Sequence, residues 1–379
     1  MHNFLSLSIL YLSCIIQSIN LSVTLNNQDK MKISNKMTKE LGIEHPIIMA
    51  PMFLVSNEAM MRAAIESGIM GVFPSLNFRN DGELEKVLKN LNKYKSENSG
   101  YTGNYGVNLI VQRSNPLFEK HLKICGEQKV PFYITSLGNP KPVIDIAHSY
   151  GAKVYCDVTN IEHAAKCASL GCDGFIAVGQ GAGGHAGPSP LHLLVPSLQH
   201  HFPDIPVIAA GGIANGEGIL SALCLGAQGV SIGTRFINST ESTVSDAYKQ
   251  GIIDAKMEDI VLTEKLSGTP CNIINTPYAK KIGYKQNWLE KLLSTNKTTK
   301  KYFKMLVQVK GMKKLEAAIH PNNYKTLWCA GQSVELINDV LPSKAITERL
   351  INELTEARKN LLLTLSGEEK APILGEINQ

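Results

Sequence analysis

The chain has 379 residues, of which 44% are hydrophobic and 19% are charged, and it carries 31 glycines and a net charge of +5. This composition is ordinary for a soluble α/β protein and excludes a disordered or fibrous chain. The length predicts either one large domain or a domain with a smaller satellite, with room for a sizeable core.

The first apolar run covers residues 4–16 (FLSLSILYLSCII) and has the length of a signal-peptide core, but no lysine or arginine precedes it. It is too short to cross a membrane as a helix. Two interpretations of residues 1–37 remain: a degenerate export signal, or a start codon assigned too early, with Met31 or Met37 opening the protein. We favour the second, because the rest of the sequence is typical of a cytoplasmic protein, and we expect no membrane association.

From residue 46 onward, short β-branched runs alternate regularly with amphipathic stretches. Most of these runs are continuously apolar, as parallel strands buried on both faces are. Eight strands are predicted, at residues 46–50, 68–73, 105–111, 130–135, 152–158, 174–179, 205–211 and 229–234. Helices are predicted between them, among them 57–68, 82–94, 160–171 and 215–226, several of which end on glycine. Eight βα units within residues 38–239 favour a (β/α)₈ TIM barrel, with a Rossmann-like fold as the alternative.

The alternation stops after Phe236. Residues 240–340 are predicted to form a smaller, mostly helical subdomain, and residues 341–379 a closing helix, near 343–362, and a tail. Residues 280–314 carry eleven lysines against one glutamate, which would suit an acidic partner or nucleic acid. Aromatic residues are not regularly interleaved with these lysines, so we interpret the run as solvated helix faces and expect no nucleic-acid partner.

The eight cysteines form no CxxC pair, and no histidine stands at zinc-finger spacing; they are residues 14, 125, 156, 167, 172, 224, 271 and 329. The sequence therefore predicts neither a disulfide framework nor a metal site. Unpaired cysteines in this number fit a reducing, cytoplasmic compartment.

Residues 178–190 (VGQGAGGHAGPSP) surround one histidine, His185, with glycine and alanine. Glycine at this density indicates either a backbone that needs positive φ or a ligand that approaches the main chain closely. The alternative is a flexible surface turn. The stretch follows the sixth predicted strand, and in a barrel the loops at the carboxyl ends of the strands build the site. A flat ring system could then lie against the bare backbone, with His185 directed at whatever the ring binds.

Two further glycine turns follow the seventh and eighth predicted strands, where barrels commonly bind phosphate. The first turn, residues 209–218 (AAGGIANGEG), contains Gly211 and Gly212. The second, residues 231–236 (SIGTRF), adds the hydroxyl of Thr234. Backbone N–H groups at a glycine turn and a helix start bind a dianion well, so the pair is a candidate phosphate cradle.

The first and third predicted strands end on the same rim as these turns, at Pro51, Met52 and Asn108. Asn108 carries both a donor and an acceptor, which suits the edge of a heteroaromatic ring. The alternative, a strand-end asparagine that satisfies its own turn, is equally compatible with the spacing.

Together these motifs resemble the nitronate monooxygenase family, whose members are FMN-dependent (β/α)₈ barrels. The resemblance runs through PIIMAPM (46–52), AGGHAG (182–187) and PVIAAGGIANGEGILSALCLGAQGVSIGTRF (206–236), with fainter matches in LSGTPCN (266–272) and WCAGQ (328–332). It covers most of residues 41–340. The GGH motif also occurs in flavin-dependent enoyl-acyl-carrier-protein reductases and related NAD(P)H:quinone reductases, so the motif alone does not decide the reaction.

The resemblance implies that His185 is the active-site histidine, able to take a proton from carbon beside a nitro group or to hold a nitronate near the flavin. It implies FMN contacts at Ala50, Pro51, Met52, Asn108, Gly183, Gly212, Ser231, Gly233 and Thr234, to which the glycine turns add Gly184 and Gly211. Family members often read QGxEAGGH, whereas Val178 and Gly181 stand at the glutamine and glutamate positions here. Gln180 is the candidate replacement for the missing amide.

The resemblance implies an FMN-dependent monooxygenase that oxidises alkyl nitronates with O₂ to a carbonyl compound and nitrite. The alternative is a flavin reductase of an enoyl thioester or quinone, with NAD(P)H as co-substrate and an acidic carrier docked on the lysine-rich run. A sugar-phosphate isomerase or aldolase is less favoured, because no Schiff-base lysine stands at a strand end and Asp157 is the single carboxylate candidate. We expect a small-molecule substrate and leave a homodimer open.

Overall fold

A computed structural model describes residues 33–112, 115–265, 269–285 and 327–367, all within one compact unit, Ile33–Gln379. Residues 1–32 of the expected leader and most of the lysine-rich run lie outside the described residues.

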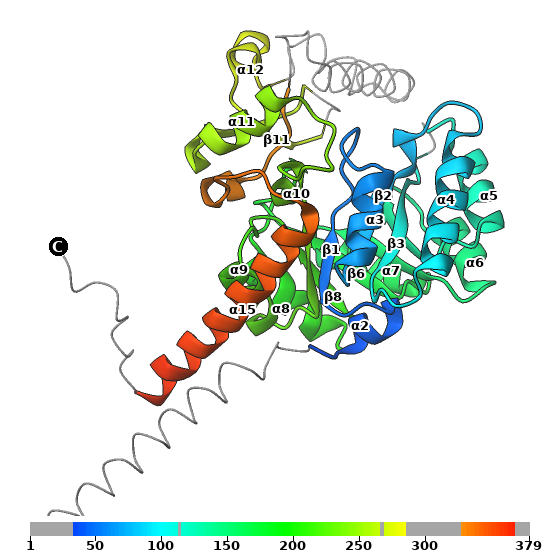
Figure 1. The fold of residues 1–379 in the computed structure, drawn as a ribbon, viewed down its shortest axis with the longest axis horizontal. Coiled ribbons are helices and arrows are strands. Elements are labelled where there is room, and N and C mark those ends of the chain that lie inside the picture. Colours follow the sequence, from blue (N-terminus) through cyan, green and yellow to red (C-terminus); the bar gives the residue numbers. More distant parts are fainter. Residues whose placement is uncertain (1–32, 113–114, 266–268, 286–326, 368–379) are drawn as a thin grey trace, which may run out of the picture. The chain divides into compact units, whose positions relative to one another are not determined.

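Eight parallel strands close into a barrel, which confirms the predicted fold (Figure 1). In order around the barrel they are β1 (Ile47–Met49), β2 (Met70–Pro74), β3 (Asn104–Ile110), β4 (Phe132–Ser136), β5 (Lys153–Val158), β6 (Gly174–Val178), β8 (Val207–Ala210) and β9 (Gly229–Ile232). The ring closes where β9 pairs in parallel with β1, with Ser231 opposite Ile48. Each strand overlaps the apolar run predicted for it, because strands buried on both faces carry few polar residues.

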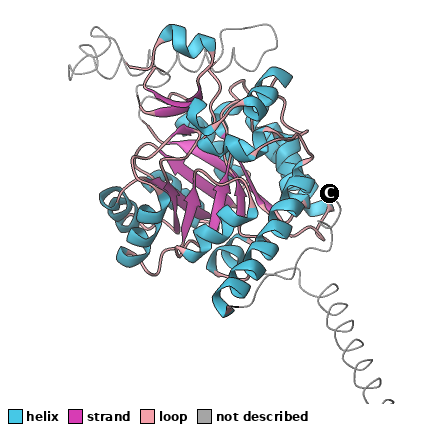
Figure 2. Cartoon of the chain, turned by 90° about the vertical axis from the view of Figure 1, so that its left-hand side faces the viewer, coloured by secondary structure: helices cyan, strands magenta, loops and turns pink. Residues whose placement is uncertain are grey.

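Helices surround these strands, as Figure 2 shows. They are α3 (Glu58–Glu66), α4 (Glu83–Glu97), α5 (Phe118–Glu127), α6 (Lys141–His148), α7 (Ile161–Ser169), α8 (Leu191–His201) and α9 (Gly216–Cys224), with short turns η1 (Ser75–Asn77) and α10 (Thr234–Ile237). An asparagine side chain caps the start of α3, α7 and α9, and a glycine with positive φ follows each of their ends. These start and stop signals explain why the sequence predicts these helices.

Helix α2 (Lys36–Leu41) closes the amino-terminal end of the barrel. Its Met37 and Leu41 are buried among the side chains that fill the barrel interior. Asn35 caps this helix, and its Nδ2 donates to the carbonyl oxygen of Gln228 at 2.5 Å. The helix therefore spans the boundary that we expected at residues 37 and 38. Because this end is filled, a site must open at the carboxyl ends of the strands.

The described part of residues 240–340 contains α11 (Asp246–Asp254), η2 (Met257–Asp259), α12 (Pro277–Ile282) and η3 (Gln332–Leu336). It also contains two strands that the sequence analysis does not predict, β10 (Ile260–Thr263) and β11 (Cys271–Ile274). These pair antiparallel with each other and with β7 (Gly184–His185), which comes from the loop after β6. The subdomain of residues 240–340, which we call the satellite, is thus joined through a small sheet to the barrel loop that carries His185.

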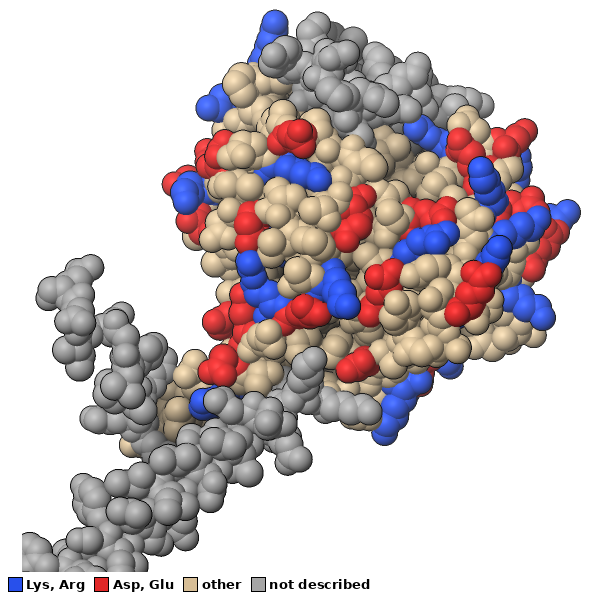
Figure 3. Space-filling view, in the orientation of Figure 1, with Lys and Arg blue, Asp and Glu red and all other residues tan. Residues whose placement is uncertain are grey.

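The closing helix α15 (Ser343–Ser366) packs against α9 and α3 (Figure 1). Its Glu353 Oε2 accepts a hydrogen bond from the backbone N–H of Gly216, at the start of α9, at 2.9 Å. No described helix has the combination of length and apolar composition that crossing a bilayer requires. On the face seen in Figure 3, the acidic and basic side chains of the described residues are interspersed and form no single-sign patch of the kind that nucleic acid binds.

Candidate active site

The predicted residues of the first and last strands meet at the carboxyl-terminal mouth of the barrel. The backbone N–H of Ala50 donates to the carbonyl oxygen of Ile232 at 2.9 Å. A Cβ on Gly233 would lie 3.7 Å from Ala50 Cβ and 3.8 Å from Met52 Sδ. Ser231 lies one layer deeper in β9 and is 6% exposed. The structure therefore brings these residues together.

The loop that contains Pro51 is held rigidly at this mouth. The backbone N–H of Met52 donates to Ser56 Oγ at 2.9 Å, and Asn77 Nδ2 donates to the carbonyl oxygen of Met52 at 3.1 Å. Asn77 Oδ1 accepts from the backbone N–H of Leu54, whose φ of 58° is unusual for a residue other than glycine. These bonds make the loop a fixed wall of the mouth, and Asn77 is a positioning residue that the sequence analysis missed.

The glycine loops after β6 and β8 approach each other through their backbones. A Cβ on Gly181 would lie 3.1 Å from both the Cα and the N of Gly212. A Cβ on Gly211 would lie 2.6 Å from the backbone nitrogen of Ala182. Gly211 and Gly212 have φ of 118° and 74°, so only glycine takes this path without strain. Gly181 occupies the place of the family's glutamate, and a side chain there would need the Gly212 backbone to shift by a few tenths of an ångström.

The turns after β8 and β9 offer backbone N–H groups to a ligand. Among the described residues, no backbone acceptor is recorded for the N–H groups of Gly212, Gly233 and Thr234. Thr234 begins α10, whose first N–H groups have no partner within the helix. These three donors lie at the turns where the sequence predicts a phosphate cradle.

The start of α9 lies beside the same turn, but two of its first N–H groups already have partners. Asn215 Oδ1 accepts from the N–H of Gly218 at 2.9 Å, and the Glu353 carboxylate accepts from that of Gly216. A carboxylate at this helix start also satisfies its dipole. Of the two helix starts that the sequence points to, the one at Thr234 is the one left open to an anion.

Gly331, in the late WCAGQ segment, completes the mouth from the satellite. Its backbone N–H donates to Thr234 Oγ1 at 3.1 Å, which leaves the hydroxyl hydrogen of Thr234 free to donate elsewhere. A Cβ on Gly331 would lie 2.3 Å from the carbonyl oxygen of Gly181 and 3.0 Å from the nitrogen of Gly183. In the sequence this segment is only a faint family match, whereas in the structure it packs against the glycine loop.

His185 lies on β7, where its backbone is opposite Cys271 of β11. Gly184 is opposite Asn272 in the same pair of strands, so the Gly184 backbone is part of the small sheet. The His185 side chain is accessible to solvent, yet the protein around it desolvates the ring and lowers its pKa below the ordinary value. The imidazole is therefore neutral at pH 7 and can accept a proton.

Asn272 holds the loop that leads into this strand. Its Nδ2 donates to the carbonyl oxygens of Gln180, at 2.9 Å, and Ala182, at 2.8 Å. Asn272 is 7% exposed, whereas the Gln180 side chain is exposed. Asn272 is a second positioning residue that the sequence analysis missed, although it belongs to the quoted LSGTPCN segment.

A wall of three polar side chains lines one side of the mouth, at the ends of β3, β4 and β5. Asn108 Nδ2 donates to Ser136 Oγ at 2.8 Å, and Ser136 Oγ donates to Asp157 Oδ2 at 2.5 Å. Burial raises the pKa of the Asp157 carboxyl to about 6, and the hydrogen bond from Ser136 opposes this rise. Asn108 is therefore in the predicted place, with Ser136 and Asp157 as partners that the sequence did not assign to it.

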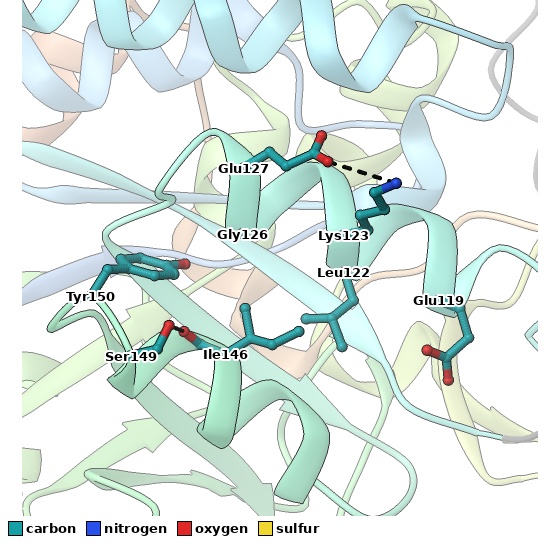
Figure 4. Close-up of a pocket in the computed structure, with 8 residues that line it drawn as sticks. All are labelled: Glu119, Leu122, Lys123, Gly126, Glu127, Ile146, Ser149 and Tyr150. Atoms are coloured by element: carbon teal, nitrogen blue, oxygen red, sulfur yellow. Dashed lines mark hydrogen bonds and ion pairs between the residues drawn. The ribbon is translucent and has the colours of Figure 1, made fainter.

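A separate pocket opens between the outer helices α5 and α6 (Figure 4). Its lining residues are Glu119, Leu122, Lys123, Gly126, Glu127, Ile146, Ser149 and Tyr150. All of them belong to these helices or to the turn after α6, on the outside of the barrel. The pocket thus includes none of the predicted site residues.

Comparisons with known proteins identify the family and agree with the barrel fold. Residues 76–355 match the family model described as nitronate monooxygenase. The (3aS,4S,5R,7aS)-5-hydroxy-7a-methyl-1-oxo-octahydro-1H-indene-4-carboxyl-CoA dehydrogenase of Mycobacterium tuberculosis is 31% identical over 66% of this chain and 69% of its own length. A probable nitronate monooxygenase of Staphylococcus aureus is 27% identical over 85% of this chain and 98% of its own. The structure of FabK from Thermotoga maritima matches with a TM-score of 0.74 at 30% identity, over 87% of this chain and 99% of that one.

Proposed function

Since this chain belongs to the nitronate monooxygenase family and is a flavin-dependent oxidoreductase, we propose that it is an FMN-dependent nitronate monooxygenase. Its substrates would be alkyl nitronates, which it oxidises with O₂ to a carbonyl compound and nitrite. The observation that carries the proposal is His185, a neutral base on a strand beside the two glycine loops of the mouth.

The residues of the mouth fit FMN. The open N–H groups of Gly212, Gly233 and Thr234 suit its phosphate, because backbone donors at a glycine turn and a helix start bind dianions. At Gly212 and Gly233, no protein atom lies closer than 3.7 Å to the place where a Cβ would stand, which leaves room for a ligand beside the backbone. Asn108 lies at the rim with its amide held by the protein. When bound, FMN would supply the redox chemistry, taking electrons from the substrate and passing them to O₂.

His185 would convert a neutral nitroalkane into the nitronate that is the substrate. A nitroalkane reacts as its nitronate, which forms when a base removes the proton from the carbon beside the nitro group. The lowered pKa of His185 keeps the imidazole neutral at pH 7, as a base requires. Once charged by that proton, the ring stabilises the nitronate anion. The backbone ladder of β7 with β11 fixes the strand from which the ring projects.

Anaerobic mixing of the purified protein with FMN tests the proposal. One sample receives an alkyl nitronate and the other NADH, and the flavin absorbance is followed in both. The proposal expects rapid bleaching by the nitronate, and nitrite in stoichiometric amount when air is admitted. It is overturned if no nitronate bleaches the flavin.

A second candidate is a flavin-dependent reductase or dehydrogenase of a thioester. The observation that favours it is the relative of Mycobacterium tuberculosis, which is named for a carboxyl-CoA substrate. For this function we expect bleaching by NADH, or by a saturated acyl thioester, and no nitrite. The same anaerobic experiment therefore separates the two candidates.

A further inference from the structure

The polar wall formed by Asn108, Ser136 and Asp157 is one layer of the barrel interior. Ile134 and Tyr155, two residues before Ser136 and Asp157, face the buried core of the barrel. Side chains two apart on a strand face the same side, so Ser136 and Asp157 also point inward, one layer closer to the mouth. The hydrogen bond from Asn108 to Ser136 places Asn108 in the same layer.

The hydrogen bonds in this layer have a fixed direction. Asn108 Nδ2 donates its two hydrogens to the carbonyl oxygen of Ile134, at 3.1 Å, and to Ser136 Oγ, at 2.8 Å. A serine hydroxyl has one hydrogen, and Asp157 accepts it. Ser136 Oγ therefore faces Asn108 as an acceptor. A flipped amide would set Asn108 Oδ1 against two oxygens, so Oδ1 is held on the other side.

Asn108 Oδ1 is left as an acceptor for a ligand. No described residue donates a hydrogen bond to this oxygen, and the oxygen is not fully buried. The isoalloxazine ring of oxidised FMN has one ring N–H, the imide at position 3. An acceptor at the mouth that meets the ring therefore has a single ring donor to bind.

We propose that Asp157 and Ser136 are positioning residues, which hold the Asn108 amide so that Oδ1 accepts a hydrogen bond from the imide N–H of bound FMN. The inference rests on the FMN site of the proposed function. Asp157 is suited to this role because an ionised carboxylate accepts from a hydroxyl more strongly than a neutral group does. A buried carboxyl with one recorded protein partner among the described residues otherwise destabilises the fold.

The test compares the affinities of FMN and 3-methyl-FMN, whose imide nitrogen carries a methyl group in place of the hydrogen. The dissociation constants are measured by flavin fluorescence at pH 8, where Asp157 is ionised. We expect the unmodified protein to bind FMN roughly tenfold more tightly than 3-methyl-FMN, because the methyl group removes the one hydrogen bond from the imide to Asn108 Oδ1. In Ser136→Ala and Asp157→Asn the preference should fall to about threefold or less, mainly through weaker binding of FMN.

Two control variants match these changes outside the mouth. Ser149→Ala removes a hydroxyl from the pocket of Figure 4, and Asp145→Asn removes an exposed carboxylate of α6. Both should keep the full preference for FMN. The inference is overturned if Ser136→Ala and Asp157→Asn bind FMN with an unchanged preference, an outcome that leaves the proposed function intact. If the unmodified protein binds neither flavin, both proposals fail.

Discussion

His185 is the residue on which the proposed reaction depends, and its environment determines the pH at which it works. Desolvation lowers the pKa of the imidazole. A base acts in its neutral form, so kcat/KM should rise as pH increases through this lowered pKa and stay level above pH 7. An ordinary histidine would still be partly protonated near pH 6.5.

Replacing His185 with asparagine removes the base and keeps a polar side chain of similar size. We expect kcat/KM for a nitroalkane to fall roughly 100-fold and its pH inflection to disappear. FMN affinity should change little, because the proposed phosphate and ring contacts do not include the His185 side chain. His192→Asn, at an exposed histidine of α8, is the matched control and should keep both the rate and the inflection. Near-normal turnover by His185→Asn would show that the imidazole is not the base.

Asp157 affects the stability of the fold, because burying its carboxylate lowers the free energy of unfolding. Its pKa is raised to about 6 in the folded protein, from the ordinary value of 3.8. The folded state therefore binds the proton more tightly than the unfolded state. Below pH 4 the carboxyl is protonated in both states, and the free energy of unfolding decreases as pH rises from about 4 to 6. The loss is up to about 3 kcal/mol above pH 6.

Asp157→Asn should abolish this loss. We expect the variant to match the unmodified protein at pH 4 and to be more stable at pH 8, by up to about 3 kcal/mol in urea denaturation. Asp145→Asn, at an exposed site, should show no such gain at pH 8. A variant that is less stable than the unmodified protein at pH 8 would mean that the Asp157 charge is favourable in the fold.

At the scale of elements, α15 and α9 pack so closely that one glycine is required between them. A Cβ on Gly216 would lie 2.0 Å from the backbone nitrogen of Leu354 and 2.2 Å from the carbonyl carbon of Glu353. Backbone atoms cannot move aside as a flexible side chain can. We expect Gly216→Ala to lower the free energy of unfolding by about 2 kcal/mol or more. Gly218→Ala, where the nearest atom is 3.2 Å away, should change it by about 1 kcal/mol at most, measured in the same denaturation series.

The elements also show what the sequence can and cannot predict. All eight barrel strands were predicted, because each is a local apolar run bounded by turn residues. The sheet of β10, β11 and β7 was missed, because β7 is two residues of a glycine loop and becomes a strand only by pairing with distant β11. The partners of Asn108 were missed for a related reason. Ser136 and Asp157 lie on other strands, and only the register of the barrel brings them to it.

At the scale of the whole molecule, FMN binding should raise the free energy of unfolding. A ligand that binds the folded state alone raises the free energy of unfolding by about 2.7 kcal/mol at 100 times its dissociation constant. We expect FMN to raise the melting temperature accordingly, and equimolar riboflavin, which lacks the phosphate, to raise it much less. Equal shifts from the two flavins would contradict the cradle at Gly212, Gly233 and Thr234.

The pairing of β7 with β11 also bears on how the protein matures. His185 leaves the ribosome well before Cys271, and Gly331, which closes over the glycine loop, follows later still. During translation, the barrel strands are therefore complete while the histidine strand still lacks its neighbour. The proposed base therefore reaches its final place last, when β11 pairs with β7, and a chain interrupted after the barrel would lack this pairing.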